Sequence, residues 1–463
     1  MKHGSVTENI TRDACAVLGI EGLQEPINGF LRRIETHLSK LCGGAPQFED
    51  LAYAAEYYYL FRRVHAGCEH LPVRSILAGD YFYSRFLQAL NRIGRADISR
   101  AFADALCREA ASGDEVCDED AYLAFLKSLR QGRDTDAGGS MAAFLSESVR
   151  LGRDSLQDLD DCLTRASACE NAAMREGISR ILLAGGKRLR PRLCRICYSF
   201  GEEPKKPVLP LLYMLELMHN ASLIHDDIID EAPIRRGVPT IHETNGRCMA
   251  VMSGDYLLGR LMEALPYYYG TGINEEVASV AIRMCGGEFS QLDARFHIKE
   301  QTLSRYYVQI RDKTAYLLAI SCSMGATAAG LPEADVRALY GYGEQIGIAF
   351  QIRDDMLDFT AEPAFGKEKA KDLRSGIYTL PFLYACRTCP DPAMIRLSEQ
   401  EEKSEEEIGC LIDYTDASGG FRYAQEVIRD CSKKAQDCLA ALPDGEAKAE
   451  LTALSESLCE RKR

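Results

Sequence analysis

The sequence has no excess of basic residues and few segments in which polar and apolar residues alternate. Its 463 residues include 69 acidic and 55 basic side chains, which give a formal net charge of −14 at pH 7. Nonspecific binding of nucleic acid needs a broad basic surface, so we expect no nucleic-acid partner. Alternation with a period of two is typical of half-buried strands, and its scarcity argues against a protein built on β-sheets.

The hallmarks of a secretory signal and of a zinc ribbon are also missing. Residues 1–19 contain no apolar run of the kind that forms the core of a signal peptide. Together with the presence of 18 cysteines, this favours a reducing cytoplasm and free thiols. The CxxC pairs Cys194/Cys197 and Cys386/Cys389 lack the flanking ligands and turn residues of a zinc site. We therefore expect these cysteines to be structural.

The uncharged run at 314–332, TAYLLAISCSMGATAAGLP, raises the question of a membrane span. Its length approaches the ~20 residues that cross a bilayer. Its many Ser, Thr, Gly and Ala residues instead favour a helix that is buried inside a protein. We therefore expect no transmembrane helix here.

Helical periodicity dominates the sequence. Apolar residues recur at i, i+3, i+4 and i+7 in stretches such as 209–227 and 276–292, which is the pattern of a helix that packs against a core. The sequence therefore predicts an all-α protein. The stretch RQGRDTDAGGS interrupts the pattern with glycine and charge. We expect a smaller helical domain at 1–131, a linker at 132–140 and a larger domain at 141–463.

An internal repeat links these two domains. LAGDYFYSRFLQAL at 77–90 aligns without a gap to MSGDYLLGRLMEAL at 252–265, with six of fourteen positions identical. Common ancestry explains the similarity, and chance resemblance between two amphipathic helices is the alternative. No paired aspartates occur between His65 and Gly79. A duplicated N-terminal copy would therefore have lost the acids that lie upstream of the second copy.

A triplet of aspartates with the spacing i, i+1, i+4 occurs twice among apolar residues: Asp226, Asp227 and Asp230, then Asp354, Asp355 and Asp358. On a helix, residues i and i+4 stack one turn apart on the same face. Carboxylates that close repel each other, and a divalent cation removes the conflict. Ligands that are all oxygen suit Mg²⁺. One such motif is equally explained by a solvated acidic face, but two favour metal binding.

Cationic and polar side chains accompany the acids. GGKRLRPRL presents Lys187, Arg188, Arg190 and Arg192 after a glycine pair that lets backbone approach a ligand. The others are His219 two turns before Asp226, then Arg235 and Arg236, the pair Lys313 and Thr314, and Gln351. Each alone has a structural explanation. Together they indicate a helical cavity with two acidic metal clamps and several cations that bind anions.

The same residues lie within a series of motifs: GGKRLRP, LIHDDIIDEAPIRRG, GDYLLGR, GEFSQL, KTAYLL, QIRDDMLDF and DLRSGIYTLP. In this order, they make the region from about 145 to 400 resemble the trans-isoprenyl (polyprenyl) diphosphate synthases, heptaprenyl diphosphate synthase among them. The resemblance implies the all-α isoprenoid synthase fold, with the two aspartate motifs facing each other across a central cavity. RSILAGDYFYSRFLQAL is similar to the noncatalytic small subunit of two-component heptaprenyl diphosphate synthases. Residues 1–131 are therefore expected to form a noncatalytic, small-subunit-like domain.

The resemblance also implies roles for the site residues. Lys187, Arg190, His219 and Arg236 would hold the diphosphate of isopentenyl diphosphate. Asp226, Asp230 and Asp354 would lead the binding of Mg²⁺, assisted by Asp227, Asp355 and Asp358, and all six acids with Lys313 form the expected catalytic set. Arg235, Lys313, Thr314, Gln351 and Lys367 would hold the allylic diphosphate. Ala370 and Ile377 depart from the family, which often has Gly and Lys at these positions.

These roles imply a chain-elongating prenyltransferase that joins an allylic diphosphate to isopentenyl diphosphate. Metal ions and cations would neutralise the departing diphosphate. We expect a cytoplasmic enzyme with a long all-trans product of the heptaprenyl class, a precursor of quinone side chains such as that of menaquinone. A peripheral membrane contact would serve product release, and the assembly is expected to be either a homo-oligomer or an internal pseudo-heterodimer. The alternatives are a geranylgeranyl or farnesyl diphosphate synthase, with a shorter product, and a class I terpene synthase.

The helix before the first acidic motif is expected to limit product length. In the family, a bulky side chain four or five residues before the first aspartate stops growth early. Ala221 and Ser222 stand there and are small, so the upper channel should be open. Each helical turn of ~5.4 Å admits roughly one isoprene unit, which makes Leu217, Met218 and Met214 the expected floor. Ordinary core packing is the alternative role for these residues.

Overall fold

A computed structural model describes seven parts of the chain: residues 6–18, 25–42, 48–65, 73–112, 119–129, 141–360 and 369–460. These parts are helical, apart from turns and one short antiparallel ribbon. In that ribbon β1 (Ile234–Arg235) pairs with β2 (Val238–Pro239). The prediction of an all-α protein is confirmed.

The chain packs into two units. The first unit contains residues 1–192 and 205–282, and the second contains residues 193–204 and 283–463. The predicted domain boundary near residue 131 therefore falls inside the first unit, where N-terminal helices and later helices share one packed body. The proposed linker at 132–140 lies outside the described residues. The assignment of 1–131 as a noncatalytic domain stays a prediction.

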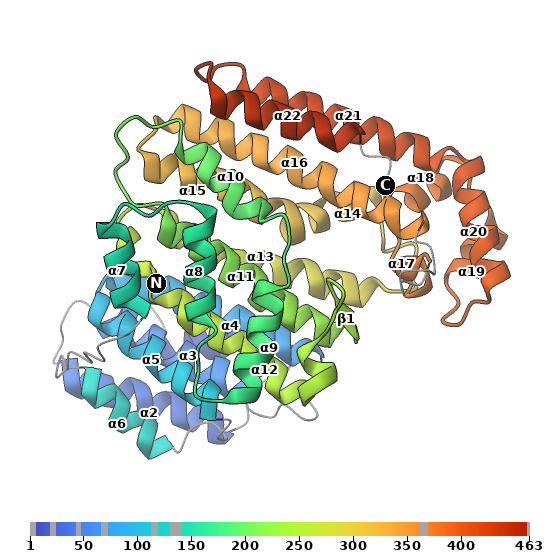
Figure 1. The fold of residues 1–463 in the computed structure, drawn as a ribbon. Coiled ribbons are helices and arrows are strands. Elements are labelled where there is room, and N and C mark those ends of the chain that lie inside the picture. Colours follow the sequence, from blue (N-terminus) through green and yellow to red (C-terminus); the bar gives the residue numbers. More distant parts are fainter. Residues whose placement is uncertain are drawn as a thin grey trace, which may run out of the picture. The chain divides into compact units, whose positions relative to one another are not determined.

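The first unit is a bundle of long helices (Figure 1). In chain order they are α1 (Val6–Leu18), α2 (Glu25–Cys42), α3 (Phe48–His65), α4 (Val73–Ile93), α5 (Ala96–Ser112), α6 (Glu119–Ser128), α7 (Met141–Arg150), α8 (Leu156–Ala166), α9 (Ala172–Leu183), α11 (Leu209–Ile229), α12 (Ile241–Met262) and the short η3 (Leu265–Tyr268). Helices α10 (Leu189–Tyr198) and α13 (Ile273–Ala294) cross the unit boundary. Helix starts follow local rules: Ser155 caps α8 in a capping box, and Asn171 caps α9.

The core of the first unit joins the N-terminal helices to α11 and α12. Helix α3 packs against α4, α11 packs against α12, and α12 in turn packs against α5. The approach of α12 to α5 is close, because a Cβ at Gly259 would lie 2.8 Å from Cys107 Sγ. Within the N-terminal helices, buried Tyr58 contacts the rings of Phe86, Phe102 and Tyr122. The N-terminal region therefore has an aromatic core of its own and also packs on α12.

The second unit is built around one long helix, α16 (Glu333–Thr360), which lies alongside α21 (Gly420–Leu439) and α15 (Tyr316–Ala329). The remaining elements are α14 (Leu303–Ile310), η4 (Arg311–Ala315), α15 (Tyr316–Ala329), α17 (Lys371–Arg374), α18 (Leu380–Thr388), α19 (Pro392–Ser398), α20 (Glu405–Ala417), α21 (Gly420–Leu439) and α22 (Glu446–Glu460). Figure 1 shows α21 and α22 side by side. Gly343 and Gly347 let α16 approach its neighbours, because a Cβ at either would lie within 2.8 Å of backbone atoms.

The uncharged run at 314–332 forms most of α15, and nearly every residue of this helix is buried. The prediction of a buried helix is confirmed. Among the described helices, none combines the length and the apolar character needed to cross a bilayer.

The two CxxC pairs differ in their surroundings. Cys194 and Cys197 are fully buried on α10, close to Cys322 of α15, and burial raises the pKa of both thiols. Cys386 is half-buried and Cys389 is exposed, and both are free. The first pair packs in the second unit as expected, whereas the second pair lies at its surface.

A buried acid in the N-terminal helices makes stability depend on pH. Glu56 on α3 is fully buried next to Thr7, whose Oγ1 donates to Glu35 Oε2 at 2.7 Å and lies 3.2 Å from Glu56 Oε1. Burial, and then the charge of Glu35, raises the pKa of Glu56 from 4.5 to about 9. The folded chain therefore binds a proton more tightly than the unfolded chain. Stability should fall as the pH rises from about 4.5 to about 9.

We expect Glu56→Gln to flatten this dependence, because the amide keeps the shape of the acid and cannot ionise. Thermal unfolding followed by circular dichroism across the same pH range measures the slope. Glu49→Gln, at an exposed position of the same helix, is the control and should behave as the parent. A Glu56→Gln variant with the parent's pH slope would show that Glu56 does not titrate in this range.

Candidate active site

The first acidic motif lies at the end of α11, and its three carboxylates face different surroundings. Asp226 is half-buried, and Asp230 is exposed where the helix ends, with its backbone N–H donating to Asp226 O at 2.8 Å. Asp227 is buried and accepts a hydrogen bond from Arg235 Nε at 2.7 Å. Asp226 and Asp230 therefore form the i, i+4 pair nearest to solvent, while Asp227 is held inside the protein.

The ion pair between Asp227 and Arg235 fixes the turn that follows α11. Arg235 lies on β1, and the ribbon with β2 places its guanidinium back over the helix end, with Nη2 2.5 Å from Asp227 Oδ1. Burial raises the pKa of Asp227, and the charge of Arg235 opposes that shift. Arg235, predicted to bind the allylic diphosphate, thus has a carboxylate partner within the protein.

The second acidic motif lies near the end of α16 and also buries its middle acid. Asp355 accepts from Tyr306 Oη at 2.6 Å and from Gln351 Nε2 at 2.8 Å, and Gln351 Oε1 accepts from Thr314 Oγ1 at 2.6 Å. Burial raises the pKa of Asp355 to about 6. The predicted residues Thr314 and Gln351 therefore do meet the second motif, in a hydrogen-bonded chain that ends on Asp355.

The outer acids of the second motif are more accessible. Asp354 is exposed and Asp358 is half-buried. The carboxylate of Asp358 accepts the backbone N–H groups of Lys371 and Asp372, each at 3.1 Å, at the start of α17. Asp358 thus links the end of α16 to the segment that carries Ala370.

A Mg²⁺ site can be tested against these carboxylates. Their oxygen atoms are the ligands that a hard divalent cation prefers, so the donor chemistry fits. Within the described residues, however, no three His, Cys, Asp or Glu side chains are grouped so that they could hold a metal ion. Mg²⁺ usually takes one or two carboxylates together with phosphate oxygens and water. The donor chemistry of each motif therefore fits a cation whose other ligands are phosphate oxygens and water.

A cluster of cations surrounds His219 of α11. Burial, and then the positive charges of Arg190, Arg236, Arg235 and Arg188, hold the pKa of His219 well below its ordinary value. The guanidinium groups of Arg188 and Arg235 also pair with carboxylates of the protein. Guanidinium groups suit phosphate oxygens, so this cluster can bind a diphosphate.

The basic residues in and after the loop before α10 differ in whether they pair with carboxylates of the protein or could bind a ligand. Arg188 pairs with Glu216 at 2.6 Å and with Asp160 at 3.0 Å, so it serves the structure. Lys187 is exposed and Arg190 is half-buried. Arg236 donates to Gly185 O at 3.2 Å, which places its guanidinium over the glycine pair of GGKRLRP. The structure therefore brings the predicted residues Arg190, His219 and Arg236 together.

Lys313 lies in η4, a π-helical segment before α15. Such segments are frequent at functional sites. Its ammonium group pairs with Glu288 of α13, which is buried. Glu288 and Tyr306 were missed in the sequence, although Glu288 is part of the GEFSQL motif. Lys367 lies outside the described residues.

Comparison with known proteins identifies the family. The sequence model of the polyprenyl synthetase family matches residues 171–415. Heptaprenyl diphosphate synthase component 2 of Geobacillus stearothermophilus is 39% identical over 247 residues, which are 53% of this chain and 75% of that protein. The chain belongs to the polyprenyl synthetase family. It is a trans-prenyltransferase, as the motifs implied.

Solved structures of polyprenyl synthetases agree with this assignment. Heptaprenyl diphosphate synthase from Staphylococcus aureus matches with a TM-score of 0.63 at 29% identity, covering 66% of this chain and 98% of that one. A polyprenyl synthase from Caulobacter crescentus, complexed with calcium and isoprenyl diphosphate, matches with a TM-score of 0.62 at 26% identity, covering 72% of this chain and 100% of that one. The predicted isoprenoid synthase fold is confirmed.

The residues predicted to limit the polyprenyl product all lie on α11, upstream of the first motif. Met214, Leu217, Met218 and Ala221 are buried. Ser222 is half-buried and donates to His219 O at 2.9 Å. Their role in chain length stays a prediction.

Ala370, where polyprenyl synthetases often have glycine, has a left-handed backbone. Its φ is 55° and its ψ is 46°, it is fully buried, and its N–H donates to Asp358 O at 2.8 Å. This conformation costs a residue with a Cβ roughly 1 kcal/mol or more, and glycine adopts it freely. The other departure, Ile377, is half-buried, and its N–H donates to Asp372 O at 2.9 Å.

We expect Ala370→Gly to stabilise the folded protein by roughly 1 kcal/mol, because the left-handed strain is removed. The midpoint of unfolding in urea, followed by circular dichroism, measures the change. Ala449→Gly in the exposed face of α22 is the control and should destabilise by roughly 1 kcal/mol, the usual cost of glycine inside a helix. If both variants lose stability, Ala370 is not strained.

Proposed function

We propose that this enzyme condenses an allylic diphosphate with isopentenyl diphosphate and makes a long-chain all-trans polyprenyl diphosphate of the heptaprenyl class. The observation that carries the proposal is the arginine cluster around His219, on the same helix as the first acidic motif. The arginine cluster would bind one diphosphate, and metal ions bound to the acidic motifs would bind the other. The likeness to heptaprenyl diphosphate synthases supports the product class.

The two substrates would be held by different residues. We assign the diphosphate of isopentenyl diphosphate to Lys187, Arg190, His219 and Arg236. We assign the allylic diphosphate to Arg235, Lys313, Thr314, Gln351 and Lys367, together with Mg²⁺ on Asp226, Asp230 and Asp354. The match to a polyprenyl synthase that was complexed with calcium and isoprenyl diphosphate supports a divalent cation.

The proposed reaction forms one carbon–carbon bond and breaks one carbon–oxygen bond. When bound, Mg²⁺ would supply charge neutralisation for the departing diphosphate. The guanidinium and ammonium groups of the chain do the same from fixed positions, so little reorganisation is needed as charge develops. The allylic C–O bond breaks with its electron pair on the diphosphate. The alkene of isopentenyl diphosphate then supplies its π electrons to the allylic cation, and a proton leaves to the released diphosphate.

The buried acids Asp227 and Asp355 would position their neighbours. Asp227 holds Arg235 at the end of α11, and Asp355 holds Gln351 and Tyr306 in the second unit. Each fixes a turn of helix whose other acids are more accessible. We therefore propose a structural role for the middle acid of each motif.

The alternatives have less support. A class I terpene synthase uses an acidic clamp but has no need of the second diphosphate site that the His219 cluster offers. A geranylgeranyl or farnesyl diphosphate synthase would have the same chemistry and a shorter channel. The small side chains of Ala221 and Ser222 favour the longer product.

We further propose that residues 1–131 form a noncatalytic domain, which makes the chain an internal pseudo-heterodimer. The component 2 relative from Geobacillus stearothermophilus, whose name implies a partner component, supports this arrangement. The product would serve as a quinone side-chain precursor and leave through a peripheral membrane contact. The number of cysteines in the sequence supports a cytoplasmic location.

Metal dependence provides the first test of this proposal. Asp226→Ala or Asp354→Ala should lower turnover at least about a hundredfold, the scale of losing one fixed charge-stabilising group. Both proteins should keep the parent's helical content. The assay supplies allylic diphosphate, isopentenyl diphosphate and Mg²⁺, and prenyl alcohols are analysed after dephosphorylation. The exposed Asp413 on α20 provides the control, Asp413→Ala. Near-parental turnover of either motif variant would refute the assignment.

Product length provides the second test. Ala221→Phe should block the channel along α11 and shift the products to about three or four isoprene units, because one helical turn matches roughly one unit. Ala221→Ser adds only a hydroxyl group and should keep the parent's products. An active Ala221→Phe enzyme with unchanged products would mean that the growing chain runs elsewhere.

A further inference from the structure

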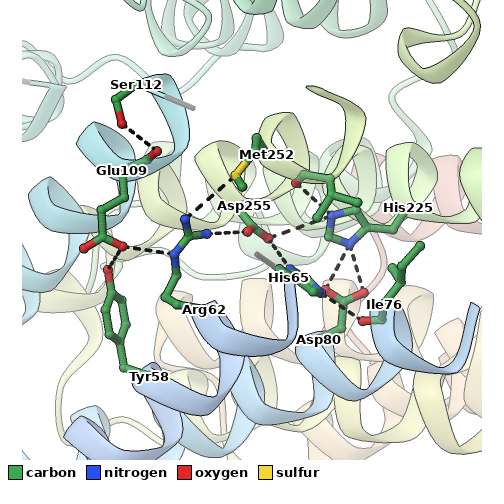
Figure 2. A network of polar contacts seen from close by, with 11 residues as sticks. Tyr58, Arg62, His65, Ile76, Asp80, Glu109, Ser112, His225, Met252 and Asp255 are labelled. Carbon is green, nitrogen blue, oxygen red and sulfur yellow. Dashed lines mark hydrogen bonds and ion pairs between the residues drawn. The ribbon is translucent and has the colours of Figure 1, made fainter. Parts of the chain in front are cut away.

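A buried polar network joins the N-terminal helices to α11 and α12 within the first unit (Figure 2). Arg62 and His65 of α3 and Asp255 of α12 have side chains with no exposed surface, and Arg62 Nη1 donates to Asp255 Oδ2 at 2.5 Å. His225 of α11 is 2% exposed and Asp80 of α4 is 14% exposed. Buried charges need such partners. The network therefore fixes the position of the N-terminal pair of helices, α3 and α4, relative to the other pair, α11 and α12.

The network is reciprocal. His65 of the N-terminal pair donates from Nδ1 to Asp255 Oδ1 at 2.8 Å. His225 of the other pair donates from Nδ1 to both carboxylate oxygens of Asp80, each at 3.0 Å. In each case the other ring nitrogen faces a backbone carbonyl, Ile76 O at 3.1 Å from His65 Nε2 and Val251 O at 3.3 Å from His225 Nε2. Each histidine thus binds the aspartate of the opposite pair.

The glycine of each GDY sequence makes room for one histidine. A Cβ at Gly79 would lie 1.9 Å from His65 Nε2, and a Cβ at Gly254 would lie 2.1 Å from His225 Nε2. Real atoms cannot approach that closely. The glycine and aspartate shared by the two repeats therefore serve the same histidine contacts in both copies.

Equivalent residues also touch each other across this contact. Tyr83 and Leu258 occupy the same place in the aligned repeats, 175 positions apart, and Tyr83 Oη donates to Leu258 O at 2.7 Å. The rings of His65 and His225 meet edge to face, with centroids 5.4 Å apart. Contacts of i with j and of j with i, together with contacts between equivalent residues, are the signature of a twofold interface. The two copies of the repeat therefore pack against each other through reciprocal contacts.

The two copies differ in the residues directly after the histidine. His225 precedes Asp226 and Asp227, whereas His65 precedes Ala66 and Gly67. Both copies take part in the interface, but only the second has acids directly after its histidine. Among the residues that the N-terminal copy contributes, Asp80 holds the residue next to Asp226.

We propose that Asp80 is a positioning residue for the first acidic motif. Its carboxylate fixes His225, and through it the last turn of α11 that carries Asp226. Rotating that turn would leave Asp80 and His225 without partners in a buried site, which is costly. The role rests on the proposed function, because the motif is taken to bind Mg²⁺ with diphosphate. The N-terminal copy would then orient the proposed metal ligand Asp226 from within the same chain.

The test measures metal binding as well as turnover. Asp80→Asn keeps the size of the side chain and removes its charge. Removing a residue that hydrogen-bonds a metal ligand typically weakens metal binding roughly 10- to 100-fold. Asp80 acts through His225, the neighbour of the proposed ligand Asp226, so we take the lower end and expect about tenfold weaker Mn²⁺ binding in the presence of inorganic diphosphate. Electron paramagnetic resonance of free Mn²⁺ gives the affinity. The Mg²⁺ concentration for half-maximal turnover should rise by about the same factor.

Tyr83→Phe is the matched control. It removes a buried hydrogen bond of the same interface, one turn further along α4, without touching His225. It should lower the unfolding temperature and leave Mn²⁺ affinity unchanged. If folded Asp80→Asn binds Mn²⁺ as tightly as the parent, Asp80 is structural only and the proposal fails.

Two further outcomes are decided by the same experiment. If Asp80→Asn does not fold, Asp80→Glu replaces it in the test. This variant keeps the charge but displaces it by one methylene group, so it should weaken Mn²⁺ binding. An Asp80→Glu protein with the parent's Mn²⁺ affinity would refute the proposal. A parent that binds Mn²⁺ with diphosphate but forms no prenyl product would refute the proposed function alone, because the binding comparison remains valid. A parent that binds no Mn²⁺ would refute both.

Discussion

The structure of the first unit depends on how charge is compensated on α11. This helix is buried along almost its whole length, yet it carries Glu216, His219, His225 and the first acidic motif. Burying an apolar group is favourable, whereas burying an uncompensated charge is costly. Each buried charge has therefore received a partner from another part of the chain, and these partners determine which loops and helices lie around α11.

These partners come from segments that precede α11 in the chain and from a segment that follows it. Arg188, from the loop before α10, pairs with Glu216, and Arg235, from the ribbon after α11, pairs with Asp227. Asp80, from the N-terminal copy, pairs with His225. His219 is half-buried near several arginines, and burial and then their positive charges hold its pKa well below its ordinary value. Glu216, Asp227 and His225 are thus each compensated by a residue from outside α11.

The second acidic motif meets the same constraint by a different route. Asp355 is as buried as Asp227, but its neighbours Tyr306 and Gln351 are neutral hydrogen-bond donors. Neutral donors stabilise a carboxylate less than a guanidinium does. Burial raises the pKa of Asp355 to about 6, and the hydrogen bonds from Tyr306 and Gln351 oppose that shift. Two motifs with one spacing thus differ in the electrostatics of their middle acid.

The sequence by itself determined the helical class, the buried nature of the run at 314–332, and the family. These depend on periodicity, composition and short motifs, which are local properties. The spacing of the acids also predicted that Asp226 and Asp230 share one side of a helix. Their order among the other motifs was enough to imply the chemistry.

The tertiary structure decided which member of each polar group faces inward. Spacing along a helix leaves Asp226 and Asp227 equivalent until the packing of the helix is known, and it cannot distinguish Arg188, held by Glu216, from Arg190. Contacts with Glu288, Tyr306 and Asp80 join residues far apart in the chain, so no local pattern reveals them. The repeat was visible in the sequence, but its meaning was not, because only the fold shows that each copy's aspartate binds the other copy's histidine.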